Sequence, residues 1–282
     1  MAKLCFIALV ASLLPVQCLG APTCGTGGLE ESETTGIVKI INDRRTALVD
    51  GTQSNGGGSQ NLPPAKSMRA ITWSCELEKA TQDGLSSHSC ADGFAPLDPQ
   101  GRAQFYNYDS IDSATTVEEY IRGRLAEIDH TALKDVSQSS VKFQDDILTN
   151  EYSYAVRATT TQIGCTKKVC TDEGMFAIYC LTDQKALTNG EIIYEVGTAG
   201  QCTDCPSGTA CDPTSKLCVM GWATSNKLGC SIVKCATSNR YVAVCRYSPG
   251  GNIVNSNVYT VGSVCSACPS GSTSCSPNEG LC

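Results

Sequence analysis

The sequence has few of the residues on which catalysis and metal binding most often depend. Only 2 of its 282 residues are histidines, His88 and His130, and only 6% are aromatic. A Ser–His–Asp relay and a histidine-containing zinc site both need a positioned imidazole, and no catalytic signature surrounds either histidine. We therefore expect no enzyme activity and no cofactor.

Basic clusters and long apolar runs are also scarce. The net charge is −7, and the only basic clusters we single out are the pairs Arg44-Arg45 and Lys167-Lys168. We interpret both pairs as solvated faces, so the sequence predicts no nucleic-acid partner. No apolar run reaches the roughly 20 residues that a membrane-spanning helix needs, which predicts no membrane span.

The N-terminus has the pattern of a secretory signal. Met1-Ala2-Lys3 is followed by an apolar run from Leu4 to Val16 and then by a small-residue site at Gly20. A charged start, a short apolar run and such a site are typical of a cleaved signal peptide. We therefore predict that residues 1–20 are removed and that the mature chain is secreted and extracellular.

Cysteine is abundant, and its spacing repeats. Of 19 cysteines, cleavage removes Cys5 and Cys18, which leaves 17. Cysteines from position 165 to 218 follow steps of 5, 10, 22, 3, 6 and 7, and those from 230 to 282 follow steps of 5, 10, 20, 3, 7 and 7. A period this long indicates a duplicated piece of a domain. Most cysteines of a secreted chain form disulfides.

Local patterns predict helices first and strands afterwards. Apolar spacing indicates helices over residues 37–48 and 68–78, and Thr116 with Glu119 forms a capping box at the start of a third. Short β-prone runs follow at residues 176–181 and 192–196, and residues 241–247 and 258–261 repeat them. This order favours an α+β layered domain.

Four motifs stand out along the chain: Ile41-Asn42-Asp43-Arg44-Arg45, Trp73-Ser74-Cys75-Glu76, Ala158 to Cys165, and Tyr194-Glu195-Val196-Gly197 before Cys-x-x-Cys. Together they resemble the CAP superfamily of cysteine-rich secretory, antigen 5 and pathogenesis-related proteins. The chain is most similar to the nematode branch, the activation-associated or venom-allergen-like secreted proteins.

The resemblance implies an α-β-α sandwich with a cysteine-rich C-terminal tail and a duplicated partial half-domain. We expect a CAP domain at residues 21–200, a cysteine-rich hinge at 201–219, and a partial repeat of the C-terminal half at 220–282. A two-domain ancestor that lost the first half of its second domain explains this, and a mis-spliced gene model is the alternative.

The resemblance also bears on cysteine pairing. Ten cysteines in the first unit match a single nematode domain, whereas the repeat has seven, one of which lacks a partner from the missing helical half. We predict that Cys230 is unpaired, because the later cysteines can pair among themselves. The cysteines predicted in disulfides are Cys24, Cys75, Cys90, Cys165, Cys170, Cys180, Cys202, Cys205, Cys211, Cys218, Cys235, Cys245, Cys265, Cys268, Cys275 and Cys282.

Many members of the family have a cleft with two histidines and two glutamates that can hold a divalent metal. Carried over by position, those four residues fall on His88, Ala103, Glu127 and Glu151. Only Glu127 is clearly retained, so the resemblance implies a degenerate cleft without metal.

The resemblance implies a secreted, non-enzymatic binding protein of a parasitic nematode that modulates host immune or haemostatic cells. Its partner is expected to be a host protein or cell-surface receptor. The alternative is a lipid or sterol carrier, with an apolar groove near Phe105, Tyr106 and Tyr108.

Overall fold

The computed structural model describes residues 24, 28–202, 204–206, 209–220, 227–235 and 240–248. The predicted signal peptide, strand 258–261 and the cysteines at 265, 268, 275 and 282 lie outside the described residues. The principal sheet has the strand order β1-β5-β6-β2. Its strands are β1 (Thr72–Trp73), β2 (Arg102–Ser110), β5 (Gln162–Cys170) and β6 (Met175–Lys185).

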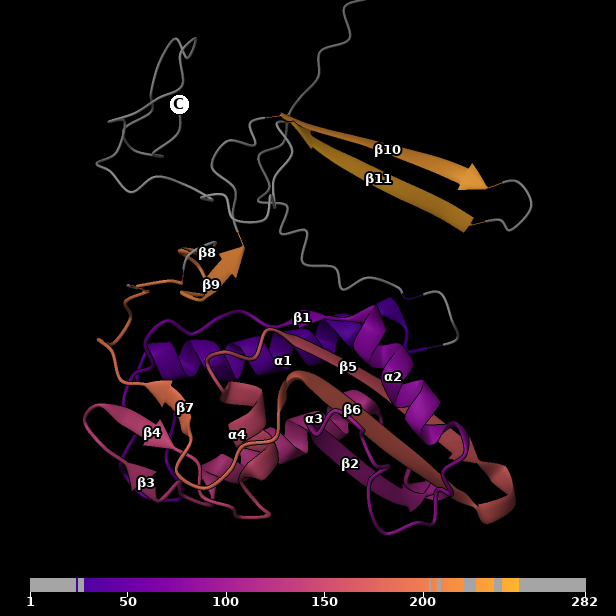
Figure 1. Cartoon of the computed structure of the whole chain (residues 1–282), viewed down its shortest axis with the longest axis horizontal. Coiled ribbons are helices and arrows are strands. Elements are labelled where there is room, and N and C mark those ends of the chain that lie inside the picture. The colour runs from indigo at the N-terminus through magenta and orange to yellow at the C-terminus, as the bar shows by residue number, and fades with distance from the viewer. Residues whose placement is uncertain are drawn as a thin grey trace, which may run out of the picture.

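The two faces of β6 show how the layers are built. Successive strand residues point to opposite faces. Ala177, Tyr179 and Leu181 are buried with Leu77 and Leu85 of α2 (Cys75–Ser86), whereas Phe176, Ile178 and Cys180 are buried in the larger core on the other face. That core is covered by α1 (Glu31–Val49), α3 (Val117–Ala126) and α4 (Asn150–Val156). Helices on both faces of a sheet make an α-β-α sandwich, as expected (Figure 1).

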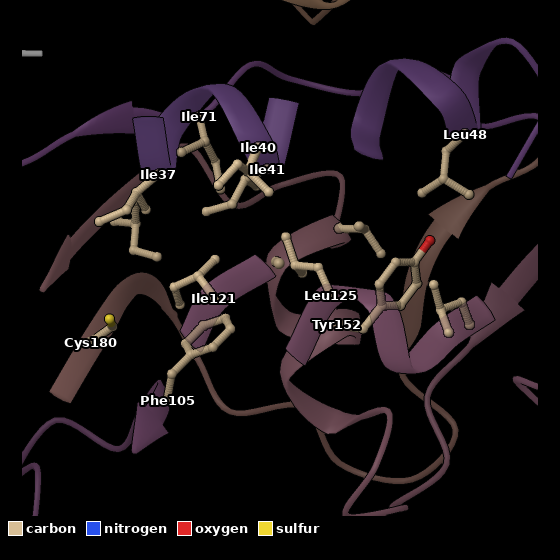
Figure 2. Packing of buried hydrophobic residues seen from close by; sticks show 14 of the residues in the cluster. Ile37, Ile40, Ile41, Leu48, Ile71, Phe105, Ile121, Leu125, Tyr152 and Cys180 are labelled. Carbon is tan, nitrogen blue, oxygen red and sulfur yellow. The ribbon is translucent and has the colours of Figure 1, made fainter. Parts of the chain in front are cut away.

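The larger core is assembled from segments distant in sequence. Ile37 and Ile41 of α1 lie above Ile121 of α3, and Phe105 of β2 and Tyr152 of α4 complete the layer (Figure 2). All five side chains are fully buried. Burying large apolar side chains contributes about 1.5–3 kcal/mol each, so the packing of α1 on α3 is a principal source of stability.

The helices agree with the sequence patterns where a cap is encoded. The capping box is confirmed, because Thr116 Oγ1 accepts from Glu119 N at 3.1 Å and Glu119 Oε2 accepts from Thr116 N at 2.8 Å. The expected helix over residues 68–78 is wrong in its start. Ser74 caps α2 through Leu77 N, and the residues just before it form β1, paired in parallel with β5.

The strand predictions at 176–181 and 241–247 fall within β6 and β11 (Arg240–Ser248), and the one at 192–196 extends one residue beyond β7 (Ile192–Glu195). A small sheet has the order β3-β4-β7, with β3 (Asp135–Val136) and β4 (Ser140–Lys142). The sequence patterns did not identify β2, whose outer residues from Asn107 onward are mostly polar and exposed. It is a strand because it pairs with β6.

The interpretation of the basic pairs as solvated faces is wrong for Arg45, Lys167 and Lys168, whereas Arg44 is partly exposed. Arg45 is fully buried and donates hydrogen bonds to the carbonyl oxygens of Arg69, Ala155, Arg157 and Thr160. Lys168 donates to the carbonyls of Leu85, Ser86 and His88 at the end of α2, and Lys167 donates to the carbonyl of Thr115. These cations satisfy backbone oxygens that the chain buries, which local sequence does not reveal.

Five disulfides join the ten cysteines of the first unit. The bonds are Cys24–Cys75, Cys90–Cys170, Cys165–Cys180, Cys202–Cys211 and Cys205–Cys218. Cys24–Cys75 ties the N-terminal segment to α2. Cys90–Cys170 ties the loop after α2 to β5. The third lies within the sheet, between directly opposed residues of β5 and β6.

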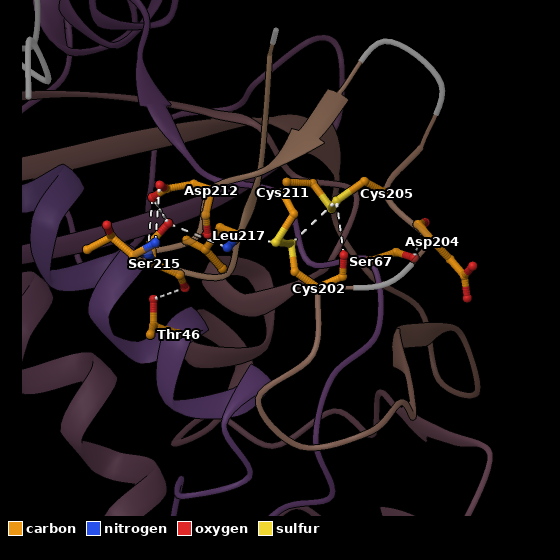
Figure 3. Close-up of a disulfide and its surroundings, with 11 residues drawn as sticks. Thr46, Ser67, Cys202, Asp204, Cys205, Cys211, Asp212, Ser215 and Leu217 are labelled. Carbon is orange, nitrogen blue, oxygen red and sulfur yellow. Dashed lines mark hydrogen bonds between the residues drawn. A yellow bond between two sulfur atoms is a disulfide. The ribbon is translucent and has the colours of Figure 1, made fainter. Parts of the chain in front are cut away.

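The cysteine-rich segment from 201 to 219 contacts the sandwich at several points (Figure 3). Thr46 of α1 donates to the carbonyl of Ser215 at 2.9 Å, and Ser67 donates to the carbonyl of Asp204 at 2.7 Å. The side chain of Leu217 is buried in the larger core. The segment forms a two-stranded sheet of β8 (Thr209–Cys211) and β9 (Cys218–Met220).

A separate two-stranded sheet joins β10 (Lys227–Cys235) to β11 in antiparallel pairing. Within the described part of the chain, no helix is long and apolar enough to cross a membrane.

Candidate functional site

Glu127, carried over as part of the degenerate cleft, follows one face of α3. The capping box fixes the start of this helix, and Tyr120, Arg124 and Glu127 then follow at helical spacing. Residues three and four apart lie on the same face of a helix. Tyr120 is buried, whereas Arg124 and Glu127 are each partly exposed. Glu127 is the first residue of a short 3-10 turn, η2 (Glu127–Asp129).

Glu151 is placed opposite this face by the first turn of α4, where the helix dipole favours a carboxylate. Its Oε1 accepts from the Tyr120 hydroxyl at 2.6 Å and from Tyr106 N of β2 at 3.4 Å. Its Oε2 accepts from Nε of Arg124. The side chain is only 13% exposed, so these donors replace the water that would otherwise solvate the charge.

Arg124 joins the two glutamates of the cleft. Besides bonding Glu151, its guanidinium lies 3.8 Å from Glu127 Oε1 and donates to the carbonyl of Ile147 at 2.7 Å. Burial works to lower the pKa of Arg124, but the hydrogen bond and charge of Glu151 outweigh it and raise the pKa. Burial, together with the charge of Glu151, raises the pKa of Tyr120 far above its ordinary value. The cleft therefore holds a fixed cation and a neutral phenol at physiological pH.

The other two carried-over positions supply no ligand to this cluster. Ala103 is buried in β2 and has no polar side-chain atom. His88 lies after α2 with its ring against Phe94 and Tyr106. Its Nε2 is 3.0 Å from the carbonyl of Phe94, and its Nδ1 is 3.5 Å from Asp92 Oδ2. A carbonyl only accepts, so Nε2 carries the proton and is not free to bind a metal.

The residues present do not fit a divalent metal. A zinc site needs three or four nitrogen, sulfur or oxygen ligands around one point, whereas a guanidinium already contacts both carboxylates here. Among the described residues, the one trio of potential ligands close enough together is Cys202, Cys205 and Cys218. All three are in disulfides, and a disulfide sulfur is not a thiolate ligand.

Sequence reasoning missed Tyr106, Tyr120 and Arg124 as members of this cluster. Tyr106 was expected only near an apolar groove, and Arg124 was not singled out at all. The spacing of Tyr120, Arg124 and Glu127 on a well-capped helix was the available signal. It did not indicate that α4 would bring Glu151 to the same face.

Two exposed apolar loops flank the cluster. Phe94 and Leu97 are 68% and 93% exposed, and Ile147 and Leu148 are 80% and 41% exposed. We call these four residues the apolar rim. Both loops contact the cluster through backbone carbonyls, because Tyr106 donates to Asp92 and Arg124 donates to Ile147.

A separate polar pocket of about 370 Å³ lies along α1 and is lined in part by Asp43, Arg44, Gln53, Arg122 and Asp129. Arg44 forms a two-pronged bond with Asp129, at 2.9 and 2.7 Å. The charged groups of Arg44 and Asp129 are therefore paired with each other rather than directed at a ligand.

Comparison with known proteins agrees with this fold. "Ancylostoma secreted protein" of Ancylostoma caninum is 48% identical over 63 residues, which is 22% of this chain but only 14% of that protein. The crystal structure of Na-ASP-1 aligns with 92% of this chain and 99% of its own at a TM-score of 0.56 and 18% identity. The structure of BmVAL-1 aligns with 70% of this chain and 98% of its own at a TM-score of 0.58 and 23% identity.

The model of the cysteine-rich secretory protein family, CAP, matches residues 38–182. That range is 145 of 282 residues, or about 51% of the chain. It includes α3, α4 and most of the principal sheet, and therefore the whole cluster around Arg124. The chain thus belongs to the CAP family of cysteine-rich secretory proteins.

Proposed function

We propose that this chain is a secreted, non-enzymatic binding protein of a parasitic nematode that modulates host immune or haemostatic cells. Its partner is a host protein or cell-surface receptor. The observation that carries the proposal is the Arg124 guanidinium, which bonds Glu151 and lies close to Glu127. The cleft is therefore satisfied internally, and recognition falls to the surface around it.

The same contacts argue against acid–base chemistry in the cleft. A general base must be able to reach a proton on the substrate. Glu151 already accepts from Tyr120, Tyr106 and Arg124, and it is mostly shielded from solvent. Glu151 therefore holds the structure together around Arg124, and Glu127 lies close to the same cation.

The apolar rim is the surface best suited to a protein partner. Exposed large apolar side chains that gather on one part of a surface are typical of interaction sites. The loop that carries Phe94 and Leu97 accepts a hydrogen bond from Tyr106 through Asp92, and Ile147 accepts one from Arg124. A partner seated there would bury the rim and cover Arg124.

The test is binding of labelled mature protein to mammalian neutrophils and platelets, measured by flow cytometry. The double variant Phe94→Ser/Leu97→Ser should weaken binding at least about tenfold, because each large apolar side chain buried against the partner contributes about 1–2 kcal/mol. The matched control is Val136→Ser on β3, which is 38% exposed and outside the rim. Equal binding by the rim variant and the wild type would contradict the rim, and no binding of the wild type would contradict the host-cell role.

The lipid-carrier alternative requires a groove at Phe105, Tyr106 and Tyr108. Phe105 is fully buried in the core and so cannot line an open groove, whereas Tyr108 is 42% exposed. Native mass spectrometry of protein purified from a secretory host separates the two functions. A lipid retained in a one-to-one complex would favour the carrier.

A further inference from the structure

The hairpin β10–β11 has the same register as β5–β6. In the first hairpin Ile163 faces Thr182 and Cys165 faces Cys180. In the second, the residues 65 positions later face each other, Leu228 with Tyr247 and Cys230 with Cys245. All eight residue pairs of β5–β6 recur with this offset in both strands. The repeated cysteine spacing is therefore accompanied by a repeated strand pairing.

This register brings two cysteines together. Cys165 and Cys180, at directly opposed positions, form a disulfide with a Cα–Cα distance of 4.0 Å. Directly opposed residues of an antiparallel pair are close enough for such a bond. We propose that Cys230 and Cys245 form the corresponding disulfide across β10–β11, which leaves Cys235 rather than Cys230 as the cysteine without a partner in the repeat.

The reason that Cys235 remains lies in the first unit. Its counterpart in the register is Cys170, which is bonded to Cys90 in the loop after α2. The sequence of residues 220–282 contains no counterpart of residues 75–90, and Cys90 is already bonded to Cys170. Across the hairpin, Cys235 faces Arg240, so no cysteine is available there either.

The other four cysteines of the repeat lie outside the described residues, but their spacing is informative. Positions 265, 268, 275 and 282 follow steps of 3, 7 and 7, close to the steps of 3, 6 and 7 at positions 202, 205, 211 and 218. The earlier four close two disulfides among themselves. The later four can therefore pair without Cys235.

The proposed bond has a structural role. An isolated two-stranded hairpin is marginally stable in water. The β5–β6 hairpin is flanked by β1 and β2 and covered by α2, whereas among the described strands β10 and β11 pair only with each other. A covalent link across the pair supplies part of the stability that those neighbours supply to the first hairpin. Its formation takes two electrons and two protons from two thiols and reduces a protein disulfide of the secretory pathway to a dithiol.

The test is a peptide map of the mature chain secreted from an oxidising host, alkylated in denaturant without reduction. We expect one linked peptide joining Cys230 to Cys245, and the alkylating reagent or a small-thiol adduct on Cys235. Cys235→Ser should retain the linked peptide and lose the label, whereas Cys230→Ser should expose Cys245. Label on Cys230 in the wild type, or a link from Cys235 to Cys245, would overturn the proposal.

Discussion

Replacing Arg45 by methionine removes the most connected buried side chain of the fold. The guanidinium donates four hydrogen bonds of 2.5 to 3.0 Å to backbone carbonyls. Those carbonyls belong to the segment before β1 and to the segment from α4 to β5. A methionine of similar length fills much of the space but donates nothing, so these buried oxygens lose their partner.

The expected loss can be worked from these bonds. A hydrogen bond in a folded protein contributes about 1–1.5 kcal/mol net, and leaving a buried acceptor unpaired costs about as much. Four bonds therefore give about 4–6 kcal/mol, which approaches the total stability of about 5–15 kcal/mol typical of a domain. The Arg157 carbonyl keeps a second donor, Thr160 N at 3.0 Å, so the expected loss lies toward the lower end of this range.

The neighbouring arginine provides the control. Arg44 is partly exposed and pairs with Asp129 at the surface, so Arg44→Met should lose about 1 kcal/mol or less. Denaturation of the two variants by guanidinium chloride under non-reducing conditions measures both losses of stability. Tryptophan fluorescence and circular dichroism follow the unfolding. If the free energies of unfolding of Arg45→Met and Arg44→Met differ by less than about 1 kcal/mol, the buried hydrogen bonds of Arg45 are not what stabilises this region.

Three further predictions test other parts of the structure. The hydrogen bond and charge of Arg44 hold the pKa of Asp129 below its ordinary value of 3.8. Because the unfolded chain then binds more protons than the folded one, the stabilisation from this carboxylate is present above about pH 4 and is lost at lower pH. Asp129→Asn should therefore destabilise the protein at pH 7 and converge with the wild type near pH 2 in urea titrations; a constant difference would contradict this. Gly164→Ala should prevent folding, because the added Cβ would lie 2.3 Å from Glu78 N; secretion of a native-like Gly164→Ala protein would refute this. The control Gly123→Ala, on the open face of α3, should raise the free energy of unfolding by about 0.5–1 kcal/mol. Arg124→Leu should cost about 2–4 kcal/mol, because Glu151 is left mostly buried without its cation, and thermal unfolding equal to the wild type would show that the pair is not stabilising.

The features that local sequence encodes were predictable. The capping box at Thr116 specifies the start of α3, because its two bonds join residues three positions apart. The apolar run at residues 176–181 predicted the central part of β6, which is buried on both faces. Motifs and cysteine spacing were sufficient to recognise the family. The cap and the strand are each encoded within a short stretch of chain.

The start of α2 and the strand β2 show where local pattern was insufficient. Apolar spacing continued through Met68 and Ile71, but those buried residues lie outside any helix, and the helix begins only after Ser74. The β2 strand is mostly polar and is a strand because β6 pairs with it. In both places a tertiary contact outweighed the local preference.

By itself, the sequence determined the family, the layered α+β class and the repeat of cysteine spacing. Only the tertiary structure decided that Arg45 is buried while Arg44 is partly exposed. It also joined Arg124 to Glu151 and placed Cys230 opposite Cys245. The physical reason is the distance along the chain over which each contact closes. Arg45 bonds carbonyls up to 115 residues away, and Arg124 meets Glu151 across 27 residues, so the partners are chosen by how helices and strands pack.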